Sequence, residues 1–203
     1  MRALSRILFV TGILCIAVYG FVAVQAHVHQ QELGAALEKE LALDRADVPG
    51  APSRRLSEGD LLGKLEIPRL RLSVMVMEGI AEKTLRLGGG HIPGTAYPGA
   101  SGNAGFAAHR DTFFQKLRNV RKDDVIKFTT RSETFAYRVA STAVVNPSDL
   151  GVLRPTSSET ITLVTCFPFY YVGPAPKRFV VHAVRASRPK MSGQIQRLKG
   201  DSI

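Results

Sequence analysis

Two runs of β-branched and aliphatic residues, separated by a loop that contains proline and glycine, constrain the fold of this chain more than any other feature. The first run covers residues 160–165 and the second covers residues 179–183. Runs of this kind favour largely buried strands. The segment between them does not suit a strand interior, because it contains Pro168, Gly173, Pro174 and Pro176. We therefore expect two strands joined by an irregular loop.

A thiol and a guanidinium group flank this loop. Cys166 comes directly after the first run, and Arg178 comes directly before the second. Consecutive strands usually lie next to each other in a sheet. A side chain at the end of one strand and a side chain at the start of the next can then face the same cleft. We expect Cys166 and Arg178 to be such a pair.

The rest of the chain also indicates a fold made mainly of β-strands. Short helices are expected at residues 82–87 and 112–119, whereas the five glycine and proline residues within 91–103 indicate a loop. Many short strands with few helices are typical of a barrel or a sandwich. Runs with strand character cover residues 62–67, 72–77, 105–108, 125–130 and 134–145. We expect the last two of these runs to pair as a hairpin.

The N-terminal segment 7–26 contains no charged residue and follows Arg2 and Arg6. About 20 apolar residues, at a rise of 1.5 Å each, cover roughly the 30 Å hydrocarbon core of a bilayer. Because the positive charges precede the segment, we expect a single-pass membrane anchor with a cytoplasmic N-terminus. A cleaved signal peptide is the alternative, but the segment is long for one and Val24-Gln25-Ala26 is a poor cleavage site.

These features divide the chain into four parts. Residues 1–26 form a cytoplasmic tip and the membrane anchor, and residues 27–60 form a juxtamembrane helix and a linker. Residues 61–188 form the folded domain outside the cytoplasm, and residues 189–203 form a basic tail. The net charge of +10 comes from scattered lysine and arginine residues, which fit anionic lipid or wall polymer as well as simple solubility. We expect no nucleic-acid partner.

The two cysteines lie in different parts of this scheme. Cys15 falls within the predicted anchor, so Cys166 is alone in the exported part and has no intramolecular disulfide partner there. An unpaired thiol in an exported domain indicates a reactive group. Because a second thiol ligand is missing and the carboxylates are scattered along the chain, we expect no metal and no cofactor.

His109 stands at the end of another apolar segment and completes a chemically useful set with Cys166 and Arg178. A thiolate is a strong nucleophile, and a nearby imidazole can take or give the proton. Attack on an amide produces an oxyanion, which a fixed guanidinium can stabilise. The imidazole can then protonate the leaving amine and deprotonate an incoming one. Interacting thiol and imidazole groups titrate as a pair, so the sequence leaves their resting proton form open.

Several motifs resemble those of the sortase family. Segment 162–166, Thr-Leu-Val-Thr-Cys, followed by Arg178 twelve residues after the cysteine, resembles the sortase signature that carries the catalytic cysteine and arginine. Segments 90–95 and 108–114 resemble the catalytic-histidine region of class D sortases, and the loop 168–179 resembles that class as well.

This resemblance implies a closed eight-stranded β-barrel and a membrane-bound cysteine transpeptidase in which Cys166, His109 and Arg178 are catalytic. It further implies cleavage of an LPxTG-like sorting signal after threonine, a thioester on Cys166, and transfer of the acyl group to an amine of the cell envelope or of a pilin. Phe167 stands where relatives often have tyrosine, and Ala108 where many have glycine. Neither departure removes a catalytic group.

Three further residues are candidates for the cleft or its support. Thr165 precedes the nucleophile, Asp111 follows His109 by two positions, and His91 lies in the glycine-rich segment. Each also has an ordinary structural explanation. Thr165 could pack beside the strand end, Asp111 could form a hydrogen bond within a turn, and His91 could be an ordinary loop histidine.

Two other classes of function compete with the transpeptidase: another cysteine enzyme of the cell envelope, and a non-catalytic binding module. An envelope cysteine enzyme of the L,D-transpeptidase type would act on peptidoglycan, but Leu-Val-Thr precedes Cys166 where that family has Ser-His-Gly. A papain-like hydrolase would place its cysteine before its histidine, the reverse of the order here. A non-catalytic, wall-binding β-barrel would leave Cys166 no more reactive in the native than in the unfolded protein.

Overall fold

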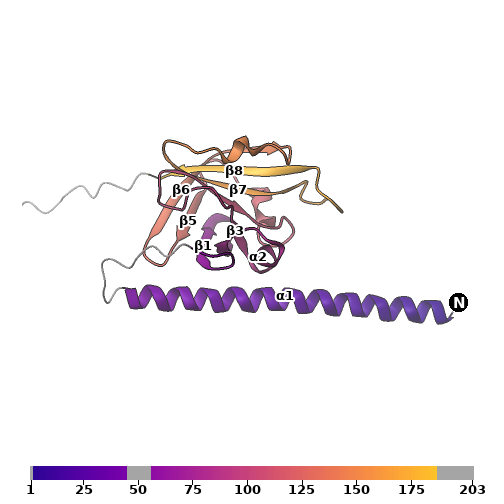
Figure 1. Cartoon of the computed structure of the whole chain (residues 1–203). Helices are drawn as coiled ribbons and strands as arrows, with labels where there is room; N and C mark the ends of the chain where they lie inside the picture. The colour runs from indigo at the N-terminus through magenta and orange to yellow at the C-terminus, as the bar shows by residue number, and fades with distance from the viewer. Residues whose placement is uncertain (1, 45–55, 187–203) are drawn as a thin grey trace, which may run out of the picture.

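A computed structural model describes residues 2–44 and 56–186 of the chain, and shows a β-barrel with one long helix beside it (Figure 1). The predicted basic tail 189–203 and part of the predicted linker lie outside the described residues. The helices are α1 (Arg2–Asp44) and α2 (Glu82–Leu87), with short 3-10 helices η1 (Pro68–Leu70), η2 (Gln115–Asn119) and η3 (Leu150–Leu153). The strands are β1 (Leu61–Ile67), β2 (Leu72–Glu78), β3 (Gly89–His91), β4 (Gly102–Ala107), β5 (Val125–Thr129), β6 (Thr134–Val145), β7 (Glu159–Phe167) and β8 (Lys177–Arg185).

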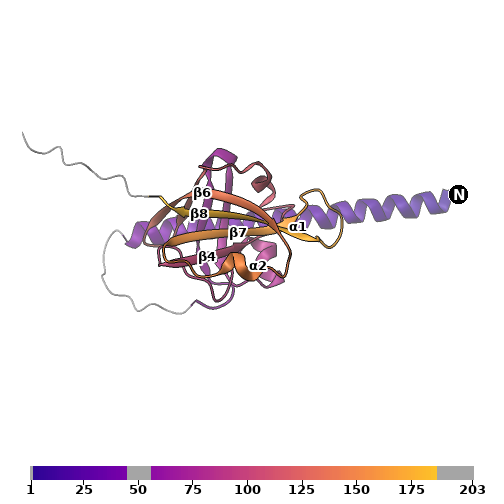
Figure 2. The ribbon, with the colours of Figure 1, turned by 90° about the horizontal axis from the view of Figure 1, so that it is seen from above.

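The eight strands close into a barrel in the order β1-β2-β3-β4-β7-β8-β6-β5, and β5 pairs with β1 to complete the circle. Two pairs, β2–β3 and β4–β7, are parallel, and the others are antiparallel. Figure 2 shows β4, β7, β8 and β6 side by side. This arrangement confirms the predicted closed eight-stranded barrel, and it confirms β5 and β6 as a hairpin.

Apolar side chains fill the barrel because alternate residues of its strands point inward. The rings of Phe106 on β4 and Phe128 on β5 stack with centroids 5.0 Å apart, and both side chains are fully buried. Phe114 and Leu117, which lie before and within η2, close the core and are also fully buried. Burial of this apolar surface is the main source of stability for the scaffold of the site.

The prediction that residues 91–103 form a loop is wrong at both ends. His91 is the last residue of β3, and Gly102 begins β4. The glycine-rich β3 forms because β2 and β4 supply hydrogen-bonding partners on its two sides, which outweighs its low strand propensity. Gly90 is required here, since a Cβ atom would lie 2.2 Å from the carbonyl oxygen of Gly79.

Helix α1 runs continuously through the predicted anchor and the predicted juxtamembrane segment, and packs against the barrel at β2 and α2. The Gln30 side chain accepts a hydrogen bond from the backbone N–H of Met75 at 2.6 Å and donates to the carbonyl oxygen of Leu87. It thereby satisfies the Met75 N–H, at the part of β2 that β3 does not reach, and the Leu87 carbonyl at the end of α2. Within the described part of the chain, we find no helix that is both long and apolar enough to cross a membrane.

Asp124 holds the η1 and η2 region together. Its buried carboxylate accepts hydrogen bonds from the Arg69 guanidinium and, at 2.8 Å, from the backbone N–H of Arg121. The Arg69 hydrogen bonds are the largest cause of the lowered pKa of Asp124.

Replacing Asp124 by asparagine is expected to lower the free energy of unfolding by about 2 kcal/mol at neutral pH, because charge-assisted hydrogen bonds are lost in a buried position. A carboxyl group with a lowered folded-state pKa stabilises the protein above its unfolded pKa of about 3.9, and this stabilisation disappears as the pH falls through the folded-state value. Urea unfolding of both proteins should therefore show a difference that shrinks below about pH 4. If the difference in unfolding free energy between the two proteins stays constant across this pH range, the Asp124 carboxylate does not stabilise the fold through its charge.

Candidate active site

The register of β7 and β8 places Cys166 directly opposite Arg178. Opposed residues of an antiparallel pair project to the same face of the sheet, with Cβ atoms about 4.5–5.5 Å apart. The thiol and the guanidinium therefore lie on one face near the end of this pair, as the sequence predicts.

The parallel pairing of β4 with β7 brings His109 to the same place. Ala107 is paired with Val164, so continuing that register by two residues aligns His109 with Cys166. The hydroxyl group of Thr165 donates a 2.7 Å hydrogen bond to the carbonyl oxygen of Ala108. This buried contact fixes the chain just before His109 against the strand that carries the thiol.

One cavity of about 340 Å³ contains all three groups. The side chains of His109, Cys166 and Arg178 are partly exposed, so a substrate can reach them. Both His109 and Cys166 line this cavity, and catalytic hydrogen bonds often form only once a substrate is bound. The lining residues are His109, Arg110, Asp111, Cys166, Gly173, Pro174, Ala175 and Arg178.

Backbone carbonyl groups hold the Arg178 guanidinium in place. Its Nη1 donates to the carbonyl oxygens of Ala175 at 3.2 Å and Lys177 at 3.0 Å. A guanidinium has five N–H donors in a rigid fork, so Nε and the other terminal nitrogen are still available to a substrate oxyanion. A donor held in advance needs little reorganisation when negative charge develops.

Arg110 holds the β7–β8 loop that supplies Gly173, Pro174 and Ala175 to the cavity, a role that the sequence did not predict. Its guanidinium donates to the carbonyl oxygens of Pro168 at 3.1 Å, Tyr171 at 2.6 Å and Gly173 at 3.2 Å. It also lies 5.8 Å from the centre of the Tyr171 ring. Two features of the sequence could have suggested this role for Arg110. An arginine directly follows the histidine, and the loop is too rich in proline and glycine to satisfy its own carbonyl groups.

Replacement of Arg110 by methionine is expected to loosen the β7–β8 loop, because three carbonyl groups lose their common donor. Chymotrypsin should then cleave after Tyr170 or Tyr171 roughly tenfold faster or more, while a lysine at position 110 should restore part of the protection. Arg121→Met, which changes an exposed arginine outside the cavity, is the matched control. Equal cleavage rates in the native protein and in Arg110→Met would show that this guanidinium does not restrain the loop.

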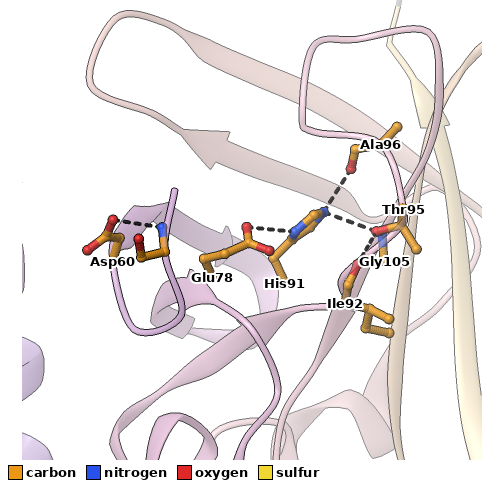
Figure 3. A network of polar contacts seen from close by, with 8 residues as sticks. Asp60, Glu78, His91, Ile92, Thr95, Ala96 and Gly105 are labelled. Carbon is orange, nitrogen blue, oxygen red and sulfur yellow. Dashed lines mark hydrogen bonds and ion pairs between the residues drawn. The ribbon is translucent and has the colours of Figure 1, made fainter. Parts of the chain in front are cut away.

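His91 lies outside the cavity, in a buried network between β2, β3 and the loop that follows (Figure 3). Its Nδ1 is 2.9 Å from Oε2 of Glu78, and its Nε2 is 2.9 Å from the carbonyl oxygen of Ala96 and 3.0 Å from the Thr95 hydroxyl. Thr95 donates its own proton to the carbonyl oxygen of Ile92, so Nε2 of His91 carries a proton. Support of the loop before β4 is the role this geometry allows.

A second polar network holds the segment between β6 and β7 against the barrel. Asn103 donates to the carbonyl oxygens of Val152 at 3.1 Å and Arg154 at 3.3 Å, and accepts a 2.7 Å bond from Thr162. Thr162 in turn lies 3.0 Å from Nδ1 of His182, whose pKa is lowered by burial. His182 is therefore a neutral, structural histidine at pH 7.

The structure thus brings Cys166, His109, Arg178 and Asp111 to one cavity, with Thr165 fixing the chain beside it. His91 is not brought to this cavity. The described residues include no group of three or more histidine, cysteine or acidic side chains placed to hold a metal ion. A nucleophile, a proton carrier and a fixed cation in one cavity can together perform acyl transfer.

The sequence and the fold both match known proteins. Residues 65–186 match the family model of the sortase domain. Sortase D of Bacillus subtilis is 32% identical over 130 residues, which is 64% of this chain and 66% of the relative. Sortase SrtE1 of Streptomyces coelicolor is 30% identical over 190 residues, 82% of this chain and 53% of that relative. The chain thus spans between about half and two thirds of the curated relatives it matches.

Among solved structures, a sortase D5 transpeptidase from Clostridium perfringens superimposes with a TM-score of 0.63 at 25% identity, covering 79% of this chain and 97% of that one. The sequence match begins within β1 and extends past the end of β8, and the superimposed sortase structure shares the fold. The motifs around Cys166, His109 and Arg178 fall within the matched region. This chain belongs to the sortase family.

Proposed function

We propose that this protein is a class D-like sortase that acts as a cysteine transpeptidase on proteins with an LPxTG-like sorting signal. The observation that carries the proposal is the convergence of Cys166, Arg178 and His109 on one cavity through the pairing of β4, β7 and β8. The similarity to sortase D of Bacillus subtilis and to the sortase D5 transpeptidase of Clostridium perfringens supports the class.

Acylation begins when the Cys166 thiolate attacks the carbonyl carbon of the threonine in the sorting signal. The carbonyl oxygen becomes an oxyanion, which accepts hydrogen bonds from free N–H groups of Arg178. When the oxyanion collapses, the C–N bond breaks and the His109 imidazolium gives its proton to the leaving amine. A thioester between threonine and Cys166 remains.

Transfer to the acceptor reverses these roles. A primary amine attacks the thioester and passes a proton to the now neutral His109, again through an oxyanion beside Arg178. Collapse breaks the C–S bond, so that a new amide and the Cys166 thiolate are released while His109 holds the proton of the incoming amine. We infer that the acceptor is an amine of the cell envelope or of a pilin.

We further propose that residues 7–26 anchor the enzyme in the cell membrane, with the N-terminus in the cytoplasm and the barrel outside. The proposal is supported by the uncharged run that follows Arg2 and Arg6. The large apolar side chains of this run that the structure describes, from Ile7 to Phe21, are exposed along α1.

Incubation of the full chain with a library of LPxTG-like peptides, with and without a primary amine, tests the transpeptidase. The expected products are the peptide cleaved after threonine and, when amine is present, the amide between threonine and that amine. Both should disappear in Cys166→Ala. Absence of both products from a folded protein would contradict the proposal, and turnover of peptidoglycan fragments instead would favour the L,D-transpeptidase type of activity.

A further inference from the structure

The β7–β8 loop carries exposed side chains that no catalytic role explains. Tyr170 is 80% exposed and Val172 is 96% exposed, and Tyr171 between them is also exposed. We call residues 170–172 the aromatic tip. Two tyrosines and a valine at the end of a loop are unusual on a surface that meets only water, and such side chains favour the interface between water and lipid.

Positive charge gathers beside this tip. Two surface hollows contain seven lysine and arginine residues and no carboxylate among their lining residues. Three of these cations are engaged in ion pairs, Lys64 with Glu66, Arg69 with Asp124 and Arg86 with Glu82. We call the other four, which are Arg71, Lys116, Arg118 and Arg121, the basic rim.

One contact and one shared hollow relate the basic rim to its surroundings. The Arg118 guanidinium lies 5.4 Å from the centre of the Tyr170 ring, so the rim adjoins the aromatic tip. The hollow that contains Arg71 and Lys116 is also lined by Tyr19 of α1, which belongs to the uncharged run 7–26. Figures 1 and 2 agree that α1 extends past the barrel at the end where the β7–β8 loop protrudes.

We propose that the aromatic tip and the basic rim form a membrane-docking surface that rests on the headgroups of an anionic bilayer. This inference rests on the proposed membrane anchor. Arginine and lysine attract anionic headgroups, and tyrosine rings favour the headgroup region of the bilayer. Because the β7–β8 loop also supplies Gly173, Pro174 and Ala175 to the cavity, docking turns the opening beside Cys166 toward the membrane surface. The enzyme then reaches sorting signals close to the bilayer.

The absence of tryptophan from the chain permits a direct test. The full chain with Val172→Trp, reconstituted in nanodiscs that contain phosphatidylglycerol, reports the environment of the tip by fluorescence. Leu150→Trp on η3 is the matched control, since Leu150 is 70% exposed outside the proposed surface. Quenching by lipids brominated on the acyl chains and by aqueous iodide measures the depth of each tryptophan.

The tryptophan at 172 is expected to be quenched by brominated lipid and to be protected from iodide by at least about threefold relative to the tryptophan at 150. Combining Val172→Trp with Lys116→Gln, Arg118→Gln and Arg121→Gln should abolish this protection. Charge removal at Lys127 and Arg154, two exposed cations outside the rim, should leave it intact.

Equal iodide access at positions 172 and 150, in a chain that co-elutes with the nanodisc, would overturn the docking surface. Failure to co-elute would overturn the anchor and the docking inference with it. Neither result bears on transpeptidation, because peptide cleavage by the same preparations reports the catalytic proposal separately.

Discussion

Replacing His109 by glutamine is expected to lower kcat for transpeptidation by roughly 10²–10⁴-fold, because glutamine cannot carry a proton between the leaving and the incoming amine. The fold should survive, since the side chain is partly exposed and the hydrogen bond from the Phe114 N–H uses the backbone carbonyl of residue 109. Steady-state kinetics with peptide and amine, together with thermal unfolding, measure both effects.

His182→Gln is the matched control, because it removes a histidine that lies on β8 outside the cavity. We expect it to retain kcat while losing some stability through the Thr162 contact. A His109→Gln enzyme within about tenfold of the native kcat would mean that another group transfers the proton.

Replacing Arg178 by lysine is expected to lower kcat by about 10²–10³-fold with little change in KM. An ammonium group presents three rotating donors and no planar fork, so it cannot bind the Ala175 and Lys177 carbonyl groups and an oxyanion in the same geometry. The loss falls on the transition state, where the oxyanion exists, and spares the bound peptide.

Lys177→Gln tests whether any positive charge near the cavity is enough to support catalysis. Lys177 neighbours Arg178 but is exposed and donates to Asn146. Its loss should change kcat less than about threefold. An Arg178→Lys enzyme that keeps its kcat and instead raises KM would assign Arg178 to peptide binding and remove it from oxyanion stabilisation.

The strands that hold the site were predictable because their residue types are informative by themselves. The runs that form β7 and β8 are β-branched and aliphatic, and proline and glycine mark the loop between them. The positions of Cys166 and Arg178 at the two strand ends therefore follow from local residue types alone. Their direct opposition depends on the pairing register, which cross-strand packing sets and local sequence does not.

Other features depend on tertiary contacts and could not be predicted. β3 consists of two glycines and a histidine, and only its neighbours β2 and β4 make it a strand. The same residue types made a loop the natural expectation for His91, whereas burial and the Glu78 carboxylate define its position. The three carbonyl partners of Arg110 lie 58 to 63 residues away along the chain, beyond the reach of any local pattern.

The central claim is that Cys166 forms a covalent acyl intermediate, and intact-protein mass spectrometry tests it most directly. The full chain is mixed with the best-cleaved peptide in the absence of amine and quenched in acid. We predict an added mass equal to the peptide fragment that ends in threonine, located on Cys166 by peptide mapping and released by an added amine. Cys15→Ser should retain this adduct and Cys166→Ala should lose it. A folded protein that cleaves the peptide without an adduct, or that carries the adduct on Cys15, would contradict the account.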